Sequence, residues 1–235
     1  MTKIGEYNLL TLLGKGRGGQ VWSALDKDGA VVALKIFNAG VAARPEYDRG
    51  RELSHPNILS PLSFSTIGDV SVMAMPMCEG RSVDNAAGYF SEEAAWKLML
   101  DIGSALAYLH SLGSCHGDVK PSNILREGNE FLLADFGAGF GGDLSSYVFA
   151  APEPVRTALS DIWSLGASVF NLVMGSQVFN GLGGRAQKKD SDLPFMRKSM
   201  PELSGLVMRC LSFDSSVRPF AAEIVRLAEE NLKRV

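Results

Sequence analysis

The feature that most constrains the fold of this 235-residue chain is a glycine-rich segment that leads into two apolar runs joined by a polar turn. The runs occupy residues 21–25 and 31–37, and the turn between them ends at Gly29. Dinucleotide-binding folds place a helix directly after glycines of this spacing, whereas this pattern predicts strand, turn and strand. A β-hairpin is therefore expected, and a dinucleotide-binding fold is disfavoured. The glycines, which let backbone amides approach phosphate groups without a Cβ in the way, are Gly14, Gly16 and Gly19.

A second segment, residues 116–123, combines an acid, a cation and an amide. Transfer of a γ-phosphoryl group requires an oriented hydroxyl, Mg²⁺ held on the phosphates, and cations that absorb developing charge. Asp118 can accept the hydroxyl proton, and Lys120 can neutralise the transferred group. Asn123 and the later Asp135 can supply hard oxygen ligands to Mg²⁺. Taken alone, such a loop is more often a turn, because Asp, Asn and Ser are common turn residues.

Besides the glycine-rich segment and residues 116–123, the chain carries the motifs Val32-Ala33-Leu34-Lys35, Asp135-Phe136-Gly137, Ala151-Pro152-Glu153, Ser160 to Gly166 and Arg218-Pro219. With these motifs, from His116 to Asn123 and beyond, nearly the whole chain resembles the protein kinase family. The resemblance implies an α+β, two-lobed protein-kinase-like fold that forms a single kinase domain over residues 1–235. A small β-rich N-lobe is expected over about residues 1–78, and a larger α-helical C-lobe over about residues 79–235.

The resemblance also implies ATP and Mg²⁺ as cofactors. Lys35 is expected to hold the α- and β-phosphates under the glycine-rich loop, and Asn123 and Asp135 are expected to bind Mg²⁺. Met75 is expected beside the adenine, although the methionines here are equally well explained as strand core. Glu153 is expected to pair with Arg218. The adenine and hinge contacts are assigned to Val21, Ala33, Met75, Met77, Cys78 and Leu125.

The helix that should present a glutamate to Lys35 is short. The best register places Glu46 there, nine residues before His55, with Glu52 as the fallback. Gly50 weakens such a helix by about 1 kcal/mol, and a helix of about nine residues is marginal without packing. We therefore expect the catalytic Lys35–Glu46 ion pair to be conditional on substrate, nucleotide or an activating protein partner. The alternative is an exposed Glu46 in an N-terminal turn.

Two further departures from the family pattern concern regulation. Gly117 precedes Asp118, where many kinases carry an arginine that pairs with a phosphorylated activation segment. Activity is therefore expected not to require phosphorylation of that segment. The segment itself has only thirteen residues, 138–150, before Ala151-Pro152-Glu153. Peptide substrates are expected to rely on other surfaces or on a partner.

Hydrophobic periodicity predicts a β-rich first part and a helical second part. Helices are expected from the N-cap Ser91 to about His110, over the almost wholly apolar segment 161–174, and over residues 220–233. Strands are expected at Tyr7 to Leu13, Val21 to Leu25, Val31 to Phe37, Ile58 to Phe64 and Val70 to Met75.

Composition limits the partners and the compartment. A net charge of −3 gives no electrostatic case for binding nucleic acid or an anionic membrane. The scattered cysteines, Cys78, Cys115 and Cys210, fit neither a disulfide framework nor a zinc site, which favours a reducing cytosol. No signal peptide is recognised, and no apolar run reaches the roughly 18 residues of a membrane-spanning helix. The expected protein is cytoplasmic, or soluble and exported by a route without a cleaved signal.

Three functions remain open. Lys120, two residues after Asp118, resembles the pattern of protein serine/threonine kinases, which implies protein substrates. The His116-Gly117-Asp118 triplet also resembles small-molecule kinases of the aminoglycoside and choline phosphotransferase type. The shortened helix around Glu46 is the one feature that favours a pseudokinase, a non-catalytic interaction module.

Overall fold

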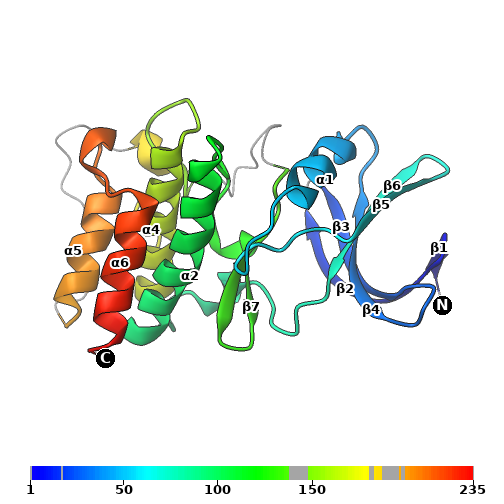
Figure 1. Cartoon of the computed structure of the whole chain (residues 1–235), viewed down its shortest axis with the longest axis horizontal. Helices are drawn as coiled ribbons and strands as arrows, with labels where there is room; N and C mark the ends of the chain where they lie inside the picture. Colours follow the sequence, from blue (N-terminus) through cyan, green and yellow to red (C-terminus); the bar gives the residue numbers. More distant parts are fainter. Residues whose placement is uncertain are drawn as a thin grey trace. The chain divides into compact units, whose positions relative to one another are not determined.

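The computed structural model describes residues 2–16, 18–137, 148–179, 183–186, 196 and 199–234, and the chain forms two compact units (Figure 1). The sheet unit comprises Met1–Ser54, Ile58–Glu79 and Ala134–Gly137. The helical unit comprises His55–Asn57, Gly80–Leu133 and Ala138–Val235. The expected α+β kinase-like fold, with a small β-rich part and a larger helical part, is confirmed.

The sheet unit contains one antiparallel six-stranded sheet with the strand order β1-β2-β3-β4-β6-β5. Its predicted hairpin is present, and Gly29 adopts a φ of 82° in the turn, where a side chain would be strained. The Asp26 carboxylate accepts hydrogen bonds from two backbone N–H groups of that turn. The elements are β1 Lys3–Ile4, β2 Tyr7–Gly16, β3 Gly19–Leu25, β4 Val31–Phe37, α1 Ala43–Arg51, β5 Ser63–Ile67 and β6 Val70–Pro76.

The two faces of this sheet have separate cores. Because side chains alternate along a strand, Val32 and Leu34 point to one face, and Ala33, Lys35 and Phe37 point to the other. The first face is closed by an apolar cluster that also contains Tyr7, Leu9, Ala24, Val72 and Ala74. On the second face, Phe37 packs with Met73 of β6 and Phe64 of β5 against Ala43 and Tyr47 of α1. The alternation therefore directs Lys35 toward α1.

The strand predicted at Ile58 to Phe64 is wrong in its boundaries. The structure begins β5 at Ser63, and the backbone before it is not part of the sheet. Pro61 has no N–H to donate to a ladder, and pairing with β6 starts only after it, with Leu62 N–H donating to the Ala74 carbonyl at 2.8 Å. Ile58 and Leu59 are buried, which gave the segment its strand-like apolar pattern.

The helical unit is built around α4, which is buried on nearly every face, as its sequence predicts. The helix α2 packs against both α4 and α6, and α5 packs against α4 (Figure 1). Ser91 caps α2 as predicted, because its side chain accepts a hydrogen bond from Ala94 N–H at 3.2 Å. The helices are α2 Glu92–Ser111, α4 Ala158–Met174, α5 Pro201–Cys210 and α6 Ala221–Leu232, and the strands of a small hairpin are β7 Ile124–Glu127 and β8 Glu130–Leu133.

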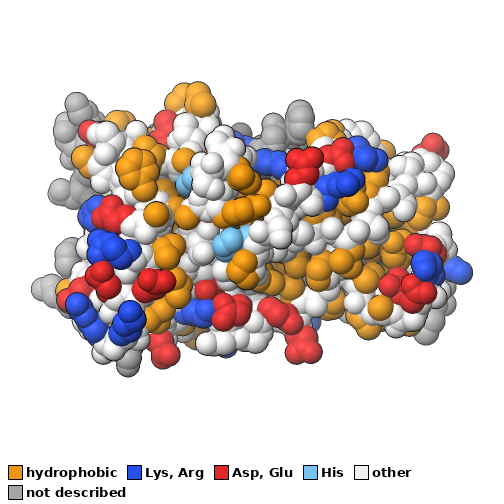
Figure 2. Space-filling model, in the orientation of Figure 1, with side chains coloured by type: hydrophobic (Ala, Val, Ile, Leu, Met, Phe, Trp, Pro, Cys, Tyr) orange, Lys and Arg blue, Asp and Glu red, His pale blue; other side chains and the backbone are white. Residues whose placement is uncertain are grey.

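Short 3₁₀ turns complete the helical unit: η1 Val83–Ala86, η2 Pro121–Asn123, η3 Gly183–Ala186 and η4 Ser215–Val217. Acidic and basic side chains are interspersed over the visible face of this unit (Figure 2). Within the described ranges, no helix is both long and apolar enough to cross a bilayer.

Candidate active site

In the sheet unit, the structure brings together the predicted lysine and two carboxylates. The Lys35 ammonium lies 2.6 Å from Glu46 Oε1 and 3.2 Å from Asp135 Oδ1. The Lys35 and Glu46 side chains are only 11% and 8% exposed, whereas Asp135 is 43% exposed. Glu46 is thus the partner of Lys35, the fallback Glu52 is not, and the alternative of an exposed Glu46 is wrong.

Tertiary packing compensates for the weak helix α1. Its Tyr47 ring packs against Phe64, with ring centroids 5.5 Å apart. Gly50, the poorest helix former of the segment, lies where a Cβ would come within 2.9 Å of the Pro61 ring. A residue other than glycine would therefore push α1 away from the sheet unit's core. The structure contains the Lys35–Glu46 ion pair, and its dependence on a ligand or partner stays a prediction.

The buried cluster of charges shifts the pKa values of both Lys35 and Glu46. Burial lowers the pKa of Lys35, but the attraction of Asp135 and Glu46 outweighs it, so the net pKa of Lys35 is raised and the ammonium stays charged. Burial and repulsion from Asp135 raise the pKa of Glu46 to about 7, against the opposing attraction of Lys35. Asp135 also has a φ of 66°, the left-handed conformation that favours glycine and asparagine.

The glycine-rich segment has the open backbone that a phosphate cradle needs. A Cβ built on Gly14 or Gly16 would have no atom within 4 Å, so neither glycine is required by packing. Gly18, which the family pattern did not single out, lies over the Lys35 side chain, with its Cβ position 4.0 Å from Nζ. Gly19 is different, since a Cβ there would overlap the Ile36 carbonyl. The residues present fit a nucleotide phosphate chain above Lys35.

The residues assigned to the adenine are partly gathered on one face of the sheet. Val21 is paired with Lys35, and Ala33 is paired with Met75, so all four share the face that carries Lys35. Met77 and Cys78 follow β6, and Cys78 is buried. Leu125 is half-buried in β7 of the helical unit, opposite Leu132.

In the helical unit, the predicted catalytic loop is assembled around Asp118. Lys120 Nζ lies 2.8 Å from Asp118 Oδ2. Asn123 Nδ2 donates to the Asp118 backbone carbonyl at 2.9 Å and to Oδ2 at 3.1 Å. The turn η2 carries Asn123 back to Asp118. The three predicted residues are therefore within hydrogen-bonding reach of one another.

Asp161, in the first turn of α4, holds this loop in place. Its carboxylate is 1% exposed and accepts hydrogen bonds from the backbone N–H groups of His116 and Gly117, both at 2.7 Å. His110 Nε2 lies 3.0 Å from the same carboxylate. His116 is buried, and its Nδ1 accepts a hydrogen bond from Asp118 N–H at 3.2 Å. The sequence predicted the buried helix but did not show that Asp161 and His110 would meet at the catalytic loop.

The predicted pair at the end of the activation segment is present. Arg218 donates to the two Glu153 carboxylate oxygens at 2.6 and 2.9 Å and is 3% exposed. Its guanidinium also lies 5.1 Å from the Trp163 ring centroid. Residues 138–147 of the activation segment lie outside the described part of the chain.

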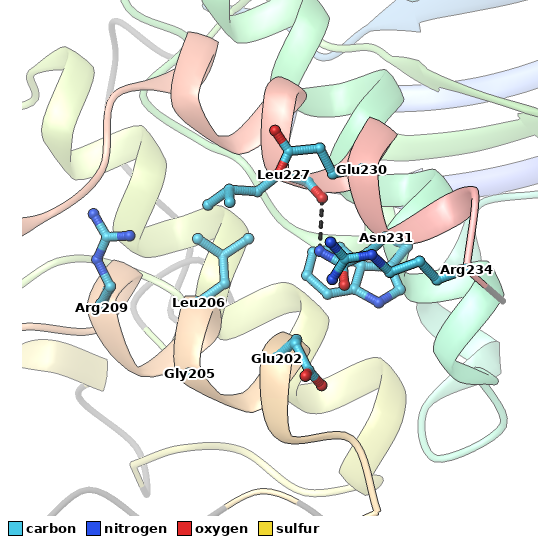
Figure 3. A pocket seen from close by; sticks show the side chains of 9 residues that line it. Glu202, Gly205, Leu206, Arg209, Leu227, Glu230, Asn231 and Arg234 are labelled. Atoms are coloured by element: carbon cyan, nitrogen blue, oxygen red, sulfur yellow. Dashed lines mark hydrogen bonds between the residues drawn. The ribbon is translucent and has the colours of Figure 1, made fainter.

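A separate cavity of about 340 Å³ lies among α2, α5 and α6 (Figure 3). Glu202, Arg209, Glu230 and Arg234 surround it, and Arg209 is already paired with Glu223 on α6 at 2.8 Å. Trp96 also lines it, and its buried indole N–H is without a hydrogen-bond partner in the described structure. The residues that line this cavity do not include any residue of the catalytic loop.

Comparison with known proteins gives a family match over most of the chain. The family model described as "Protein kinase domain" matches residues 7–228. The cytokinesis protein sepH of Aspergillus terreus is 29% identical over 96% of this chain and 19% of its own length. A probable serine/threonine-protein kinase of Dictyostelium discoideum is 29% identical over 96% of this chain and 51% of its own length. The Aurora kinase of the same organism is 27% identical over 94% of this chain and 65% of its own length. The chain thus spans only part of each of these relatives.

Proposed function

Because the chain belongs to the protein kinase family, we propose that it transfers the γ-phosphoryl group of ATP to serine or threonine hydroxyls of protein substrates. The observation that carries the proposal is the assembled catalytic loop, in which Lys120 and Asn123 both reach the Asp118 carboxylate. We further propose that residues 1–235 act as one kinase domain, with an N-lobe over about 1–78 and a C-lobe over about 79–235. The odd number and scattered spacing of Cys78, Cys115 and Cys210 support a reducing cytosol as its compartment.

ATP and Mg²⁺ fit the chemistry of the residues. Lys35 would hold the α- and β-phosphates, and the open backbone around Gly14 and Gly16 would cover them. Asp135 and Asn123 offer the oxygen ligands that Mg²⁺ prefers. The ion would neutralise charge on the phosphate oxygens. Glu46 keeps the Lys35 ammonium pointed into the site through the 2.6 Å ion pair.

The residues proposed to act on the substrate hydroxyl lie in the helical unit. Asp118 accepts a hydrogen bond from the substrate hydroxyl and takes up its proton as the phosphoryl group is transferred. Lys120, already beside Asp118, stabilises the charge on that group. Asp161 fixes the backbone before Asp118, so the loop contributes mainly positioning and electrostatic stabilisation. Lys120 two residues after Asp118 also supports Ser and Thr over Tyr as acceptors, by its resemblance to the family pattern.

We propose that this activity does not require phosphate on the activation segment. The support is Gly117, because a glycine before Asp118 offers no side-chain cation for a phosphorylated residue of the segment. Mass spectrometry of an active preparation is expected to find molecules without phosphate in residues 138–150. Activity confined to molecules phosphorylated there would contradict this part of the proposal.

The deciding experiment incubates the protein with γ-labelled ATP and Mg²⁺, with a generic protein acceptor or with aminoglycoside and choline. Label is expected on Ser and Thr of the protein acceptor and is expected to vanish in Asp118→Ala. Asp28→Ala, in an exposed turn beside Lys27, is the matched control and should transfer label like the parent. Label on the small molecules alone would select a small-molecule kinase. Nucleotide-dependent thermal stabilisation without any label would select a pseudokinase.

A further inference from the structure

The cavity between α5 and α6 is lined by one regular stripe of residues from each helix. Spacings of three and four residues place the members of each stripe on a single helix face. The two stripes face each other across the gap (Figure 3). Trp96 of α2 completes the lining. The stripe on α5 consists of Glu202, Gly205, Leu206 and Arg209, and the stripe on α6 and the residues just after it consists of Leu227, Glu230, Asn231 and Arg234.

The interior of this cavity is apolar, and its rim is charged. Leu206 and Trp96 are only 4% and 1% exposed. The side chains of Arg209 and Glu230 are 47% and 45% exposed, and each is already paired with a charge on α6, at 2.8 and 2.7 Å. Small-molecule sites typically combine an apolar lining with a few polar groups, in volumes from roughly 300 Å³ upward. At about 340 Å³, the cavity therefore suits a compact ligand.

Gly205 keeps the α5 side of the cavity open. A Cβ built there would have no atom within 4 Å, although glycine in the middle of a helix is unfavourable. The α4 side of α5 is packed tightly by comparison, since a Cβ on Gly166 of α4 would come within 2.6 Å of Cys210 Cβ. Packing thus explains the glycine between α4 and α5, but it does not explain the one that faces the cavity.

Trp96 brings an unpaired hydrogen-bond donor to the same place. Of the residues that the structure describes, it alone has a buried side-chain nitrogen or oxygen without a hydrogen-bond partner, the indole Nε1. A buried donor without an acceptor costs free energy, which an acceptor would recover. Because this N–H is closed off from solvent, a group that enters between the helices has to supply the acceptor. Glu202 and Arg234 at the rim are exposed, and exposed side chains change rotamer within nanoseconds, so they do not bar entry.

We propose that this cavity binds a small molecule with a compact apolar body and a carbonyl oxygen, which accepts a hydrogen bond from Trp96 Nε1–H. The apolar body lies between Leu206 and Leu227, whose side chains extend toward each other (Figure 3). An amide or a carboxylate can supply the acceptor, whereas an ammonium group cannot. The lining shares no residue with the catalytic loop, so binding here does not depend on the proposed kinase function.

The test follows the indole N–H signals of the isotope-labelled chain by NMR while phenylacetamide is added. The chain has three tryptophans, and the signal that is missing from Trp96→Phe identifies Trp96. The new hydrogen bond should move this signal downfield more than the other two, with a dissociation constant on the order of 1 mM for so small a molecule. Phenethylamine has the same ring and length but an ammonium in place of the amide, and it should leave the signal in place. An unmoved Trp96 signal, or the same shift with both compounds, would overturn the inference.

Two variants test the hydrogen bond and the space separately. Trp96→Phe keeps a ring in the wall but loses the donor, and saturation-transfer NMR should show about tenfold weaker binding of phenylacetamide. Gly205→Leu fills the opening with a better helix former, so it should melt no earlier than the parent and lose binding. The matched control Ala222→Leu adds the same side chain at an exposed position of α6 outside the lining, and it should bind like the parent. Unchanged binding in Gly205→Leu would overturn the inference, and this variant decides it if Trp96→Phe does not fold.

Discussion

At the scale of single residues, the function of Lys35 depends on Glu46. The variant Glu46→Gln keeps the size of the side chain but removes the charge that holds the buried ammonium at 2.6 Å. Its kcat/KM for ATP is expected to fall by about tenfold or more, which corresponds to roughly 1.4 kcal/mol of lost transition-state stabilisation. Steady-state kinetics at saturating protein acceptor would measure it.

The matched control is Glu52→Gln, at the exposed end of α1, where the same change should leave kcat/KM as in the parent. Equal turnover for Glu46→Gln and the parent would show that the ion pair is not used. Recovery of Glu46→Gln by an added binding protein would contradict a direct role in turnover and favour a role in recruiting that partner.

His55 gives the helical unit a pH-dependent contribution to stability. Burial lowers the pKa of His55 below its usual 6.5, and its Nδ1 accepts a hydrogen bond from Asn57 N–H at 3.1 Å. The unfolded chain therefore binds more protons than the folded chain at pH values below 6.5, so the free energy of unfolding falls as pH decreases through this range. Urea unfolding at pH 7.5 and 5.5 should show a smaller pH difference for His55→Gln than for the parent. The same difference in both proteins would contradict the prediction.

The contacts of some single residues can be predicted from the sequence, and those of others cannot. Glu46 was located by its spacing from His55, which follows the pattern of the protein kinase family that the chain resembles. The hydrogen bond from Gly117 N–H to the Asp161 carboxylate was not predicted, since it joins residues that lie 44 positions apart. Such contacts follow from tertiary packing, and the residue types alone do not indicate them.

At the scale of elements, α1 has a glycine that packing requires. Gly50→Ala should gain about 1 kcal/mol from helix propensity. The new Cβ would come within 2.9 Å of the rigid Pro61 ring, and such overpacking typically costs about 1–3 kcal/mol. Urea unfolding is expected to show a net loss of roughly 1 kcal/mol.

The exposed Gly205 in the middle of α5 is the matched control. A Cβ there would have no atom within 4 Å, so Gly205→Ala should raise the free energy of unfolding by about 0.5–1 kcal/mol. Stabilisation of similar size at both positions would show that the contact with Pro61 is unimportant.

The difference between local interactions and tertiary packing also explains which elements can be predicted from the sequence. The hairpin around Gly29 and the capped start of α2 at Ser91 were predicted, since turn chemistry and capping are local. The strand at Ile58 to Phe64 was misplaced, because buried apolar residues look alike whether or not their backbone joins a sheet. Here Pro61 decided the boundary, because it has no N–H to donate to a strand ladder.

At the scale of the whole molecule, charge predicts how the chain behaves toward polyanions. The 26 acidic residues outnumber the 23 basic ones, and both signs are mixed on the visible face of the helical unit (Figure 2). Sequence-independent binding to nucleic acid requires a cluster of cations that displaces counterions. Gel-shift assays with duplex DNA and flotation with anionic vesicles are expected to show no binding at 0.15 M salt. Binding that weakens steeply with added salt would contradict this.

The left-handed backbone of Asp135 has a consequence for how activity can be lost. A φ of 66° costs an aspartate free energy that asparagine tolerates better. Backbone conformation alone would thus favour asparagine at the position where the proposed Mg²⁺ chemistry requires a carboxylate, and the partly exposed ion pair of Asp135 with Lys35, at 3.2 Å, offsets only part of that preference. An Asp135→Asn chain is expected to melt no earlier than the parent while losing phosphoryl transfer. Mutational drift at this residue would therefore not be opposed by the fold, and a descendant without catalysis could persist as a stable binding protein.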